Sequence, residues 1–124
     1  MNAFELAKKT GKFAEEKKGK DIVILELTGI TDIADYFLIV SGKNERHVKT
    51  IAEHILHKMK TMGLNPYSTE GLENGRWVII DCASLVTHVF LESLREFYDL
   101  ENVWFEAKRL TMGAEKTRKG VRNG

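Results

Sequence analysis

The feature that most constrains the fold is a long amphipathic helix predicted over residues 44–62. Asn44 suits the N-cap, Gly63 stands where a left-handed C-cap is favoured, and Pro66 just beyond cannot prolong the helix. The apolar residues recur at the spacing of one helix face: Val48, Ile51, Ala52, Ile55, Leu56 and Met59. The polar side chains fall largely outside this face, so the helix is expected to cover another layer of structure.

Short apolar runs on either side of this helix predict the strands of a sheet. The runs are residues 21–27, 36–40, 77–81 and 85–90. The last two are expected to form a hairpin, and because Ala83-Ser84 matches the tightest turns poorly, a looser connection is predicted. Further helices are expected over residues 2–18 and 92–98, with Leu100, Val103 and Trp104 in a final turn. This order predicts an α/β fold with a single mixed sheet covered by helices.

One domain accounts for residues 1–110, with no internal repeat or linker. Residues 111–124 are rich in glycine and basic side chains and nearly lack apolar ones, so we expect a disordered basic tail there. The basic side chains of this tail are Lys116, Arg118, Lys119 and Arg122.

Charge and cysteine content exclude several classes of protein. Nineteen basic and 18 acidic side chains leave a net charge of +1, which predicts no general attraction to phosphate backbones. Cys82 is the only cysteine, so it forms no intramolecular disulfide, and its apolar context indicates a small buried hydrophobe rather than a catalytic thiol. No apolar run approaches the roughly 20 residues of a membrane span. A cytoplasmic location is therefore expected.

Candidates for catalysis or metal binding are weak. The sequence contains no P-loop and no Gly-x-Gly-x-x-Gly motif. His54 and His57 share one side of the long helix, but no acid or thiol at ligand spacing completes a metal site, so we interpret them as solvated polar residues. Asp32 and Asp35 precede a strand, where aspartates commonly form turns, and we prefer that reading to a pair of metal ligands. We predict no catalytic residue, cofactor or metal.

Trp77 is the most informative single residue, because it opens a strand directly after a polar segment. Alternation places Trp77, Ile79 and Asp81 on one face and Val78, Ile80 and Cys82 on the other, which looks buried. From periodicity alone Trp77 fits a core position and an interface anchor equally well. His88 alternates with Val86 and Phe90, and a structural histidine is favoured there over a contact residue.

Several motifs in a fixed order carry a resemblance to a known family. They are residues 21–25, 31–37, Ser41-Gly42 followed by residues 46–52, Glu70-Gly71, and residues 77–81, 86–90 and 95–101. Over about residue 3 to Trp104, the chain resembles the Iojap or ribosomal silencing factor family. The resemblance implies a nucleotidyltransferase-like fold without transferase activity, often a homodimer. It also implies binding to large-subunit ribosomal protein fourteen on the face that meets the small subunit, so that subunit joining and translation are repressed.

The resemblance also supplies candidate partner-binding residues. The family has a tryptophan at the position of Trp77 and polar groups near Glu70 and His88, while Asp81 shares the face of Trp77; acidic side chains would suit a basic ribosomal protein. Little direct contact with nucleic acid and no contact with membranes are expected. The sequence departs from the family pattern in having Ala34 before Asp35 and Ala83-Ser84 for Gly-Asp. The second departure removes an acidic group close to the presumed contact strands.

Two alternative functions remain open. A nucleotidyltransferase would need a Gly-Ser turn followed by strand carboxylates, whereas this chain has Ser41-Gly42 with Asp32 and Asp35 before it. We therefore predict that the protein is not an enzyme, because a shared fold does not carry activity with it. A homodimeric adaptor for another protein partner would share all the features above.

Overall fold

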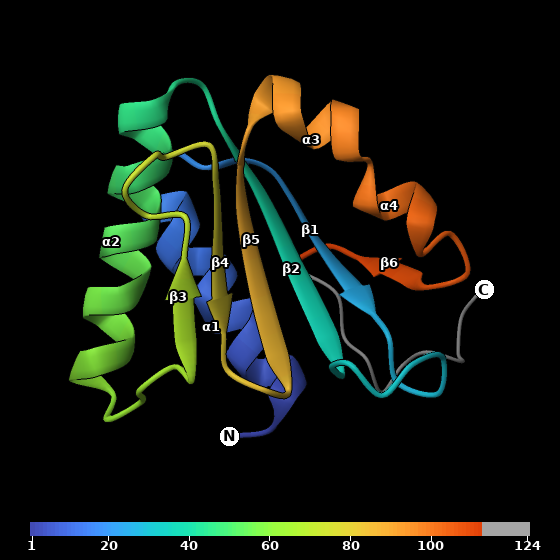
Figure 1. The fold of residues 1–124 in the computed structure, drawn as a ribbon. Coiled ribbons are helices and arrows are strands. Elements are labelled where there is room, and N and C mark those ends of the chain that lie inside the picture. Colours follow the sequence, from blue (N-terminus) through green and yellow to red (C-terminus); the bar gives the residue numbers. More distant parts are fainter. Residues whose placement is uncertain (113–124) are drawn as a thin grey trace.

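A computed structural model describes residues 1–112, which form one mixed sheet with helices on both faces (Figure 1). The strands are β1 Lys20–Glu26, β2 Tyr36–Gly42, β3 Ser68–Glu70, β4 Trp77–Asp81, β5 Leu85–Leu91 and β6 Lys108–Leu110, and the helices are α1 Ala3–Glu16, α2 Glu45–Thr61, α3 Glu92–Tyr98 and α4 Leu100–Val103. The strand order is β3-β4-β5-β2-β1-β6. Only β2 and β5 run parallel among these pairs; every other neighbouring pair is antiparallel. The predicted α/β fold with a mixed sheet is confirmed.

The helix ends follow the capping residues. Asn44 Oδ1 accepts a hydrogen bond from His47 N at 2.8 Å at the start of α2, and Gly63 adopts the left-handed φ of +76° just beyond its end. Asn2 caps α1 in the same way. Both caps satisfy amides that a helix start otherwise leaves without partners. The long predicted helix is therefore confirmed to within one residue at each end.

The main core lies between the sheet and the α1–α2 layer. The apolar face predicted for α2 points into it, and Val48, Ile51, Ala52, Ile55 and Met59 are all fully buried. Every residue of β2 is buried, because α1 and α2 cover one of its faces and apolar side chains of the second core cover the other. Burial on both faces explains why this strand reads as a continuous apolar run.

A second, smaller core lies on the opposite face of the sheet, where α3 and α4 cross it (Figure 1). Neither short helix contains a fully buried residue. They contact this core through the half-buried side chains of Leu94, Leu100 and Trp104. The α3–α4 segment therefore covers its face less completely than α1 and α2 cover theirs, and side chains of β4 stay partly exposed there.

The two edge strands, β3 and β6, were not predicted from the sequence. All three residues of β3 are exposed, and β6 has only one residue, Leu110, that is not exposed. An edge strand is open to solvent on its outer side and needs no alternation of apolar and polar residues. Residues 68–70 and 108–110 lack such a pattern, so no strand was predicted there. The predicted tail of residues 111–124 falls almost entirely outside the described residues, so it stays a prediction.

The β4–β5 hairpin is confirmed, but its connection is tighter than predicted. Cys82 N donates to the Leu85 carbonyl at 2.9 Å, which leaves only Ala83 and Ser84 between the paired ends. Asp81 Oδ1 accepts from Ala83 N at 2.8 Å and stabilises the turn. Ala83 takes a φ of +67°, a left-handed conformation that costs a residue with a Cβ roughly 1–2 kcal/mol.

The turn generates a stability prediction. Ala83→Gly removes the left-handed strain but adds freedom to the unfolded chain, so we expect a net gain of about 0.5–1 kcal/mol. Urea unfolding followed by circular dichroism measures it. Ser84→Gly is the matched control, because Ser84 lacks a positive φ and should gain nothing. Equal effects of the two substitutions would contradict the strain at Ala83.

Candidate functional site

Aromatic side chains from β4, β5 and α3 gather on the partly exposed face of the sheet. We call this group the aromatic surface: Trp77, Ile79 and Tyr98 are open to solvent in part, and the buried rings of His88 and Phe90 support them from below. The Trp77 ring stacks on Phe90 with centroids 4.7 Å apart and contacts the Tyr98 ring at the same distance. Trp77 and Ile79 are partly exposed, and Tyr98 is 46% exposed. Large rings held by neighbouring rings and open to solvent on one side are typical of protein-binding surfaces.

Trp77 is held in place by His88. The Trp77 indole Nε1–H donates to His88 Nδ1 at 3.1 Å, so the neutral imidazole carries its proton on Nε2. His88 is only 5% exposed, and burial lowers its pKa to about 4. The Phe37 ring packs on the imidazole at 4.5 Å between centroids. His88 is therefore buried beneath the aromatic surface and is less exposed than Trp77. This position agrees with the structural histidine favoured from the sequence.

Glycine at position 71 lets the segment before β4 approach the Trp77 backbone. Gly71 has a φ of +84°, and a Cβ at this position would collide with the Trp77 carbonyl oxygen. The absence of a side chain thus lets the backbone at Gly71 pack directly against the backbone of Trp77.

The four residues proposed from the sequence share one face of the sheet. Trp77, Ile79 and Asp81 alternate with buried Val78 and Ile80, which confirms the predicted facing. Asp81 uses Oδ1 in the hairpin turn. Its carboxylate therefore has a structural task beside any role in binding.

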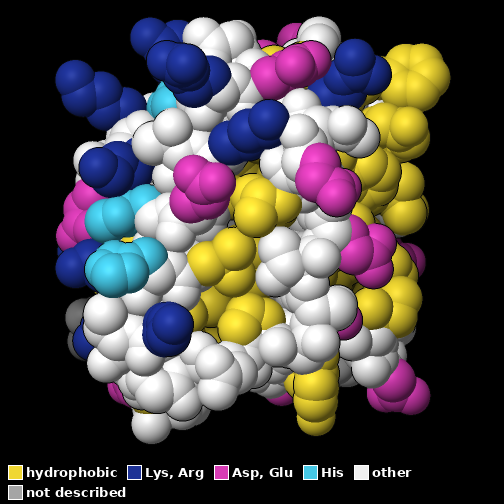
Figure 2. All heavy atoms as spheres, turned by 60° about the vertical axis from the view of Figure 1, so that its left-hand side comes forward, with side chains coloured by type: hydrophobic (Ala, Val, Ile, Leu, Met, Phe, Trp, Pro, Cys, Tyr) yellow, Lys and Arg dark blue, Asp and Glu magenta, His cyan; other side chains and the backbone are white. Residues whose placement is uncertain are grey.

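Glu70 lies beside the aromatic surface. It pairs with Ile79 across β3 and β4, and directly paired residues of antiparallel strands point to the same face. Glu70 is exposed. Figure 2, which looks from the α2 and β3 side, shows hydrophobic side chains gathered along its right-hand margin with acidic side chains beside them. The surface thus combines exposed apolar area with a negative flank.

Sequence reasoning assigned no role to Tyr98 or its neighbour Phe97. Phe97 is 77% exposed, and its ring packs edge-on against Tyr98 at 5.2 Å. Both belong to the short helix α3, in which Leu94 is the only other apolar residue. Two adjacent aromatic side chains in such a helix are the signal that could have indicated an exposed apolar surface.

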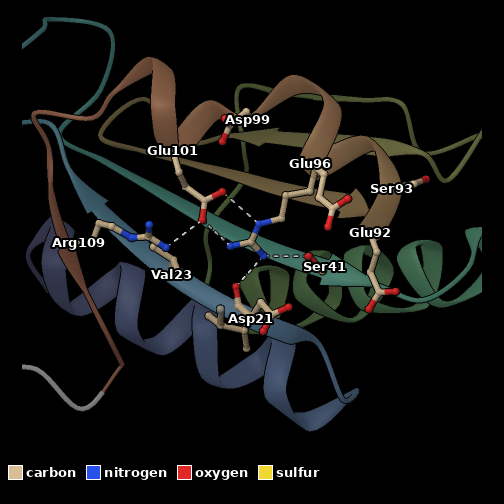
Figure 3. Close-up of a pocket in the computed structure, with 11 residues that line it drawn as sticks. Asp21, Val23, Ser41, Glu92, Ser93, Glu96, Asp99, Glu101 and Arg109 are labelled. Atoms are coloured by element: carbon tan, nitrogen blue, oxygen red, sulfur yellow. Dashed lines mark hydrogen bonds and ion pairs between the residues drawn. The ribbon is translucent and has the colours of Figure 1, made fainter.

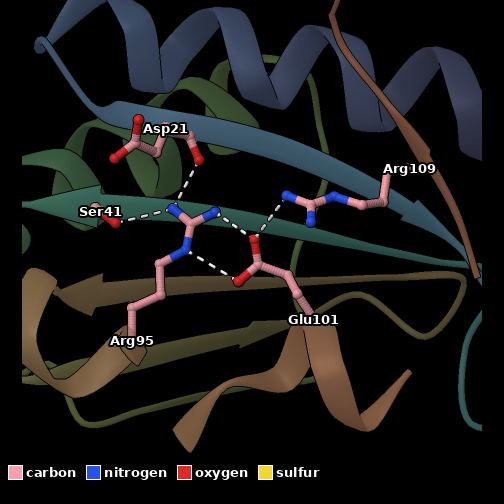
Figure 4. A network of polar contacts seen from close by, with 5 residues as sticks. All are labelled: Asp21, Ser41, Arg95, Glu101 and Arg109. Carbon is pink, nitrogen blue, oxygen red and sulfur yellow. Dashed lines mark hydrogen bonds and ion pairs between the residues drawn. The ribbon is translucent and has the colours of Figure 1, made fainter. Parts of the chain in front are cut away.

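A polar network beside α3 joins five elements of the fold, namely α3, α4, β1, β2 and β6 (Figure 4). Arg95 forms a two-pronged ion pair with Glu101, Nε to Oε1 at 3.3 Å and Nη2 to Oε2 at 2.8 Å. Its Nη1 donates to the Asp21 carbonyl at 2.6 Å and to Ser41 Oγ at 2.8 Å. Arg109 of β6 adds a contact to Glu101 Oε2 at 3.1 Å. The hydrogen bond from Arg95 is the main cause that lowers the pKa of Glu101.

The hollow beside this network is a poor site for a nucleotide. It encloses about 810 Å³ between β1, β2 and the α3–α4 segment (Figure 3). Carboxylates line it, namely those of Asp21, Glu92, Glu96, Asp99 and Glu101. Ser41 is 2% exposed, and its hydroxyl already accepts from Arg95. Because most of the Arg95 donors are used within the protein and the lining is acidic, a triphosphate would be repelled rather than held.

The remaining candidates for chemistry have structural partners. Asp35 extends the pairing of β2 toward β1 and β5 through its backbone, since its carbonyl accepts from Leu27 N at 2.8 Å and its N–H donates to the Ser84 carbonyl at 2.9 Å. The turn-forming role of the Asp32 and Asp35 side chains stays a prediction. His54 bonds Glu16 Oε1 at 2.7 Å. Cys82 is half-buried against Met59, and burial raises its pKa. Within residues 1–112, no three His, Cys, Asp or Glu side chains lie close enough together to hold a metal ion.

Comparison with known proteins assigns the chain to a class of ribosome-associated regulators. The family model described as "Ribosomal silencing factor during starvation" matches residues 1–123. The ribosomal silencing factor RsfS of Bacillus subtilis is 35% identical over 86% of this chain and 91% of its own length, and that of Chromobacterium violaceum is 33% identical over 94% and 96%. The chain therefore belongs to the ribosomal silencing factor family.

Solved structures agree with this assignment. A crystal structure of a Chromobacterium violaceum protein superposes with a TM-score of 0.82 at 30% identity, covering 93% of this chain and 95% of that one. A Bacillus halodurans crystal structure gives a TM-score of 0.77 at 33% identity, covering 86% of this chain and 97% of that one.

A mouse relative is named for mitochondrial assembly of the large ribosomal subunit. It is 29% identical over 72% of this chain, and the match spans 40% of that protein.

The buried histidine generates a prediction about pH. Because the pKa of His88 falls from 6.5 to about 4 on folding, its stabilising contribution is complete above pH 6.5 and is lost progressively as pH falls toward 4. Between pH 7.5 and 4.5 the wild type should lose about 2–3 kcal/mol more stability than His88→Gln, whose amide does not titrate. Urea unfolding at both pH values measures the difference. His57→Gln is the control at an exposed histidine, and it should behave as the wild type does.

Proposed function

We propose that this protein binds the large ribosomal subunit through large-subunit ribosomal protein fourteen and sterically blocks joining with the small subunit. Family membership supports a role in ribosome silencing, and the name of the mouse relative supports the large subunit as the place of action. The aromatic surface is the observation that carries the proposal, because it offers large, held rings on a face that the helices leave partly open. The protein then acts as a translation repressor in the cytoplasm.

The chemistry of the surface favours a basic protein over RNA as the direct contact. Glu70 flanks the aromatic surface, and acidic residues outnumber basic ones between Leu64 and Met112. Such a flank repels phosphate and attracts lysine and arginine side chains of a ribosomal protein. None of the helices within residues 1–112 combines the length and apolar character that crossing a bilayer requires.

The four proposed contact residues have different roles in binding. Trp77 is the anchor, since it is half-buried and its ring already lies flat on Phe90. Glu70 supplies negative charge beside it. His88 acts through Trp77, because it is buried and holds the indole by a hydrogen bond. Asp81 shapes the end of the same face through the hairpin turn.

The silencing mechanism predicts slower subunit joining. Light scattering follows the joining of isolated large and small subunits, and a saturating amount of this protein should slow it because the inter-subunit face is occupied. The protein should not co-sediment with isolated small subunits. An unchanged joining rate at saturation, with binding to the large subunit intact, would remove steric silencing and leave an adaptor role. Sedimentation of the free protein tests whether it forms a homodimer.

The anchor role of Trp77 predicts a large loss of affinity. Trp77→Ala should weaken binding to large subunits by about 2 kcal/mol or more, roughly thirtyfold, since hot-spot aromatics carry this much energy. The thermal midpoint of the same variant must be measured, because the lost stacking on Phe90 also costs stability. Phe105→Ala, at an aromatic that is 75% exposed beyond α4, is the matched control. Normal binding by folded Trp77→Ala would place the contact elsewhere.

A further inference from the structure

The α3–α4 segment is attached to the sheet by few directional contacts. Neither helix has a fully buried residue, and Asp99 between them has a left-handed φ of +50°. Leu94, Leu100 and Trp104 pack on the sheet, but apolar contacts are non-directional and tolerate sliding. Polar contacts therefore add the directional restraint on α3 that these apolar contacts lack.

Arg95 supplies those contacts. Its guanidinium reaches β1 at the Asp21 carbonyl, β2 at Ser41 Oγ and α4 at Glu101, and Glu101 in turn binds Arg109 of β6 (Figure 4). The Arg95 and Glu101 side chains are only 11% and 16% exposed. A two-pronged, charge-assisted pair shielded from water fixes both distance and angle.

Tyr98 follows Arg95 by one helical turn and forms one wall of the aromatic surface. Its ring contacts Trp77 at 4.7 Å and Phe90 at 6.5 Å between centroids. Because both residues belong to the same short helix, a shift of α3 at Arg95 displaces Tyr98 from Trp77. Arg95 needs no direct contact with Trp77 for this effect, because α3 connects it to Tyr98.

We infer that Arg95 is a positioning residue for the aromatic surface. By joining α3 to β1, β2 and α4, it holds Tyr98 against Trp77 before any partner arrives. A surface ordered in advance loses less freedom on binding, so the network raises affinity without touching the partner. This role rests on the proposed function for its effect on binding, while the effect on the rings is independent of that function.

The ring positions are tested first, in the free protein. Nuclear Overhauser effects between the Tyr98 and Trp77 ring protons report their contact directly. Arg95→Met keeps an unbranched apolar stem but has no donors, and it should lose these effects while still unfolding cooperatively. Arg76→Met is the matched control, since Arg76 pairs with exposed Glu45 at 3.2 Å, away from this network. Unchanged ring contacts in folded Arg95→Met would overturn the inference.

Binding provides the second arm. Arg95→Met and Tyr98→Ala should each lower affinity for large subunits about tenfold, and the double variant should be no weaker than the weaker single one, because both act through one arrangement. If the affinity losses of the two single variants multiply in the double variant, the role of Arg95 is contradicted. If Arg95→Met does not fold, Glu101→Gln, which keeps the shape of the partner but not its charge, takes its place with the same expectations. If wild-type protein binds no large subunits, the proposed function fails, and the ring contacts alone decide on Arg95.

Discussion

The parallel pairing of β2 with β5 is the constraint on which the rest of the structure depends. All seven residues of β2 are buried, and it pairs with β5 over the full length from Tyr36 to Gly42. Two strands that run parallel cannot be joined by a tight turn, so the chain must leave β2, cross and return. Helix α2 and the β3–β4 segment fill that crossover, which places Trp77 beside β5. The aromatic surface is therefore a product of this topology.

Much of the fold could be predicted because burial leaves a clear pattern in the sequence. The apolar stripe of α2 and the continuous apolar run of β2 each have one structural explanation. Strands β3 and β6 could not be found, since they lie at the edges of the sheet and are held by backbone pairing rather than by apolar side chains. The hairpin turn was judged too loose for a similar reason: Asp81 stabilises Ala83 through a side-chain contact that propensity does not include.

The candidate site was predicted only in part. Alternation placed Trp77 and Asp81 on one face and opposite buried Val78, and the register confirms it. Trp77 donates a hydrogen bond to His88, and the Tyr98 ring packs against Trp77. These contacts join residues that are distant in the sequence, so no local pattern could predict them. A net charge of +1 likewise conceals the acidic character of the second half of the described chain, because charge totals carry no information about position.

The close passage of the chain over Trp77 at Gly71 limits how this surface can diverge. A side chain at position 71 would meet the Trp77 carbonyl, and the positive φ excludes most other residues as well. Neighbouring Glu70 is exposed and under no such restriction. Side chains at position 70 can thus vary while position 71 preserves the backbone that presents them.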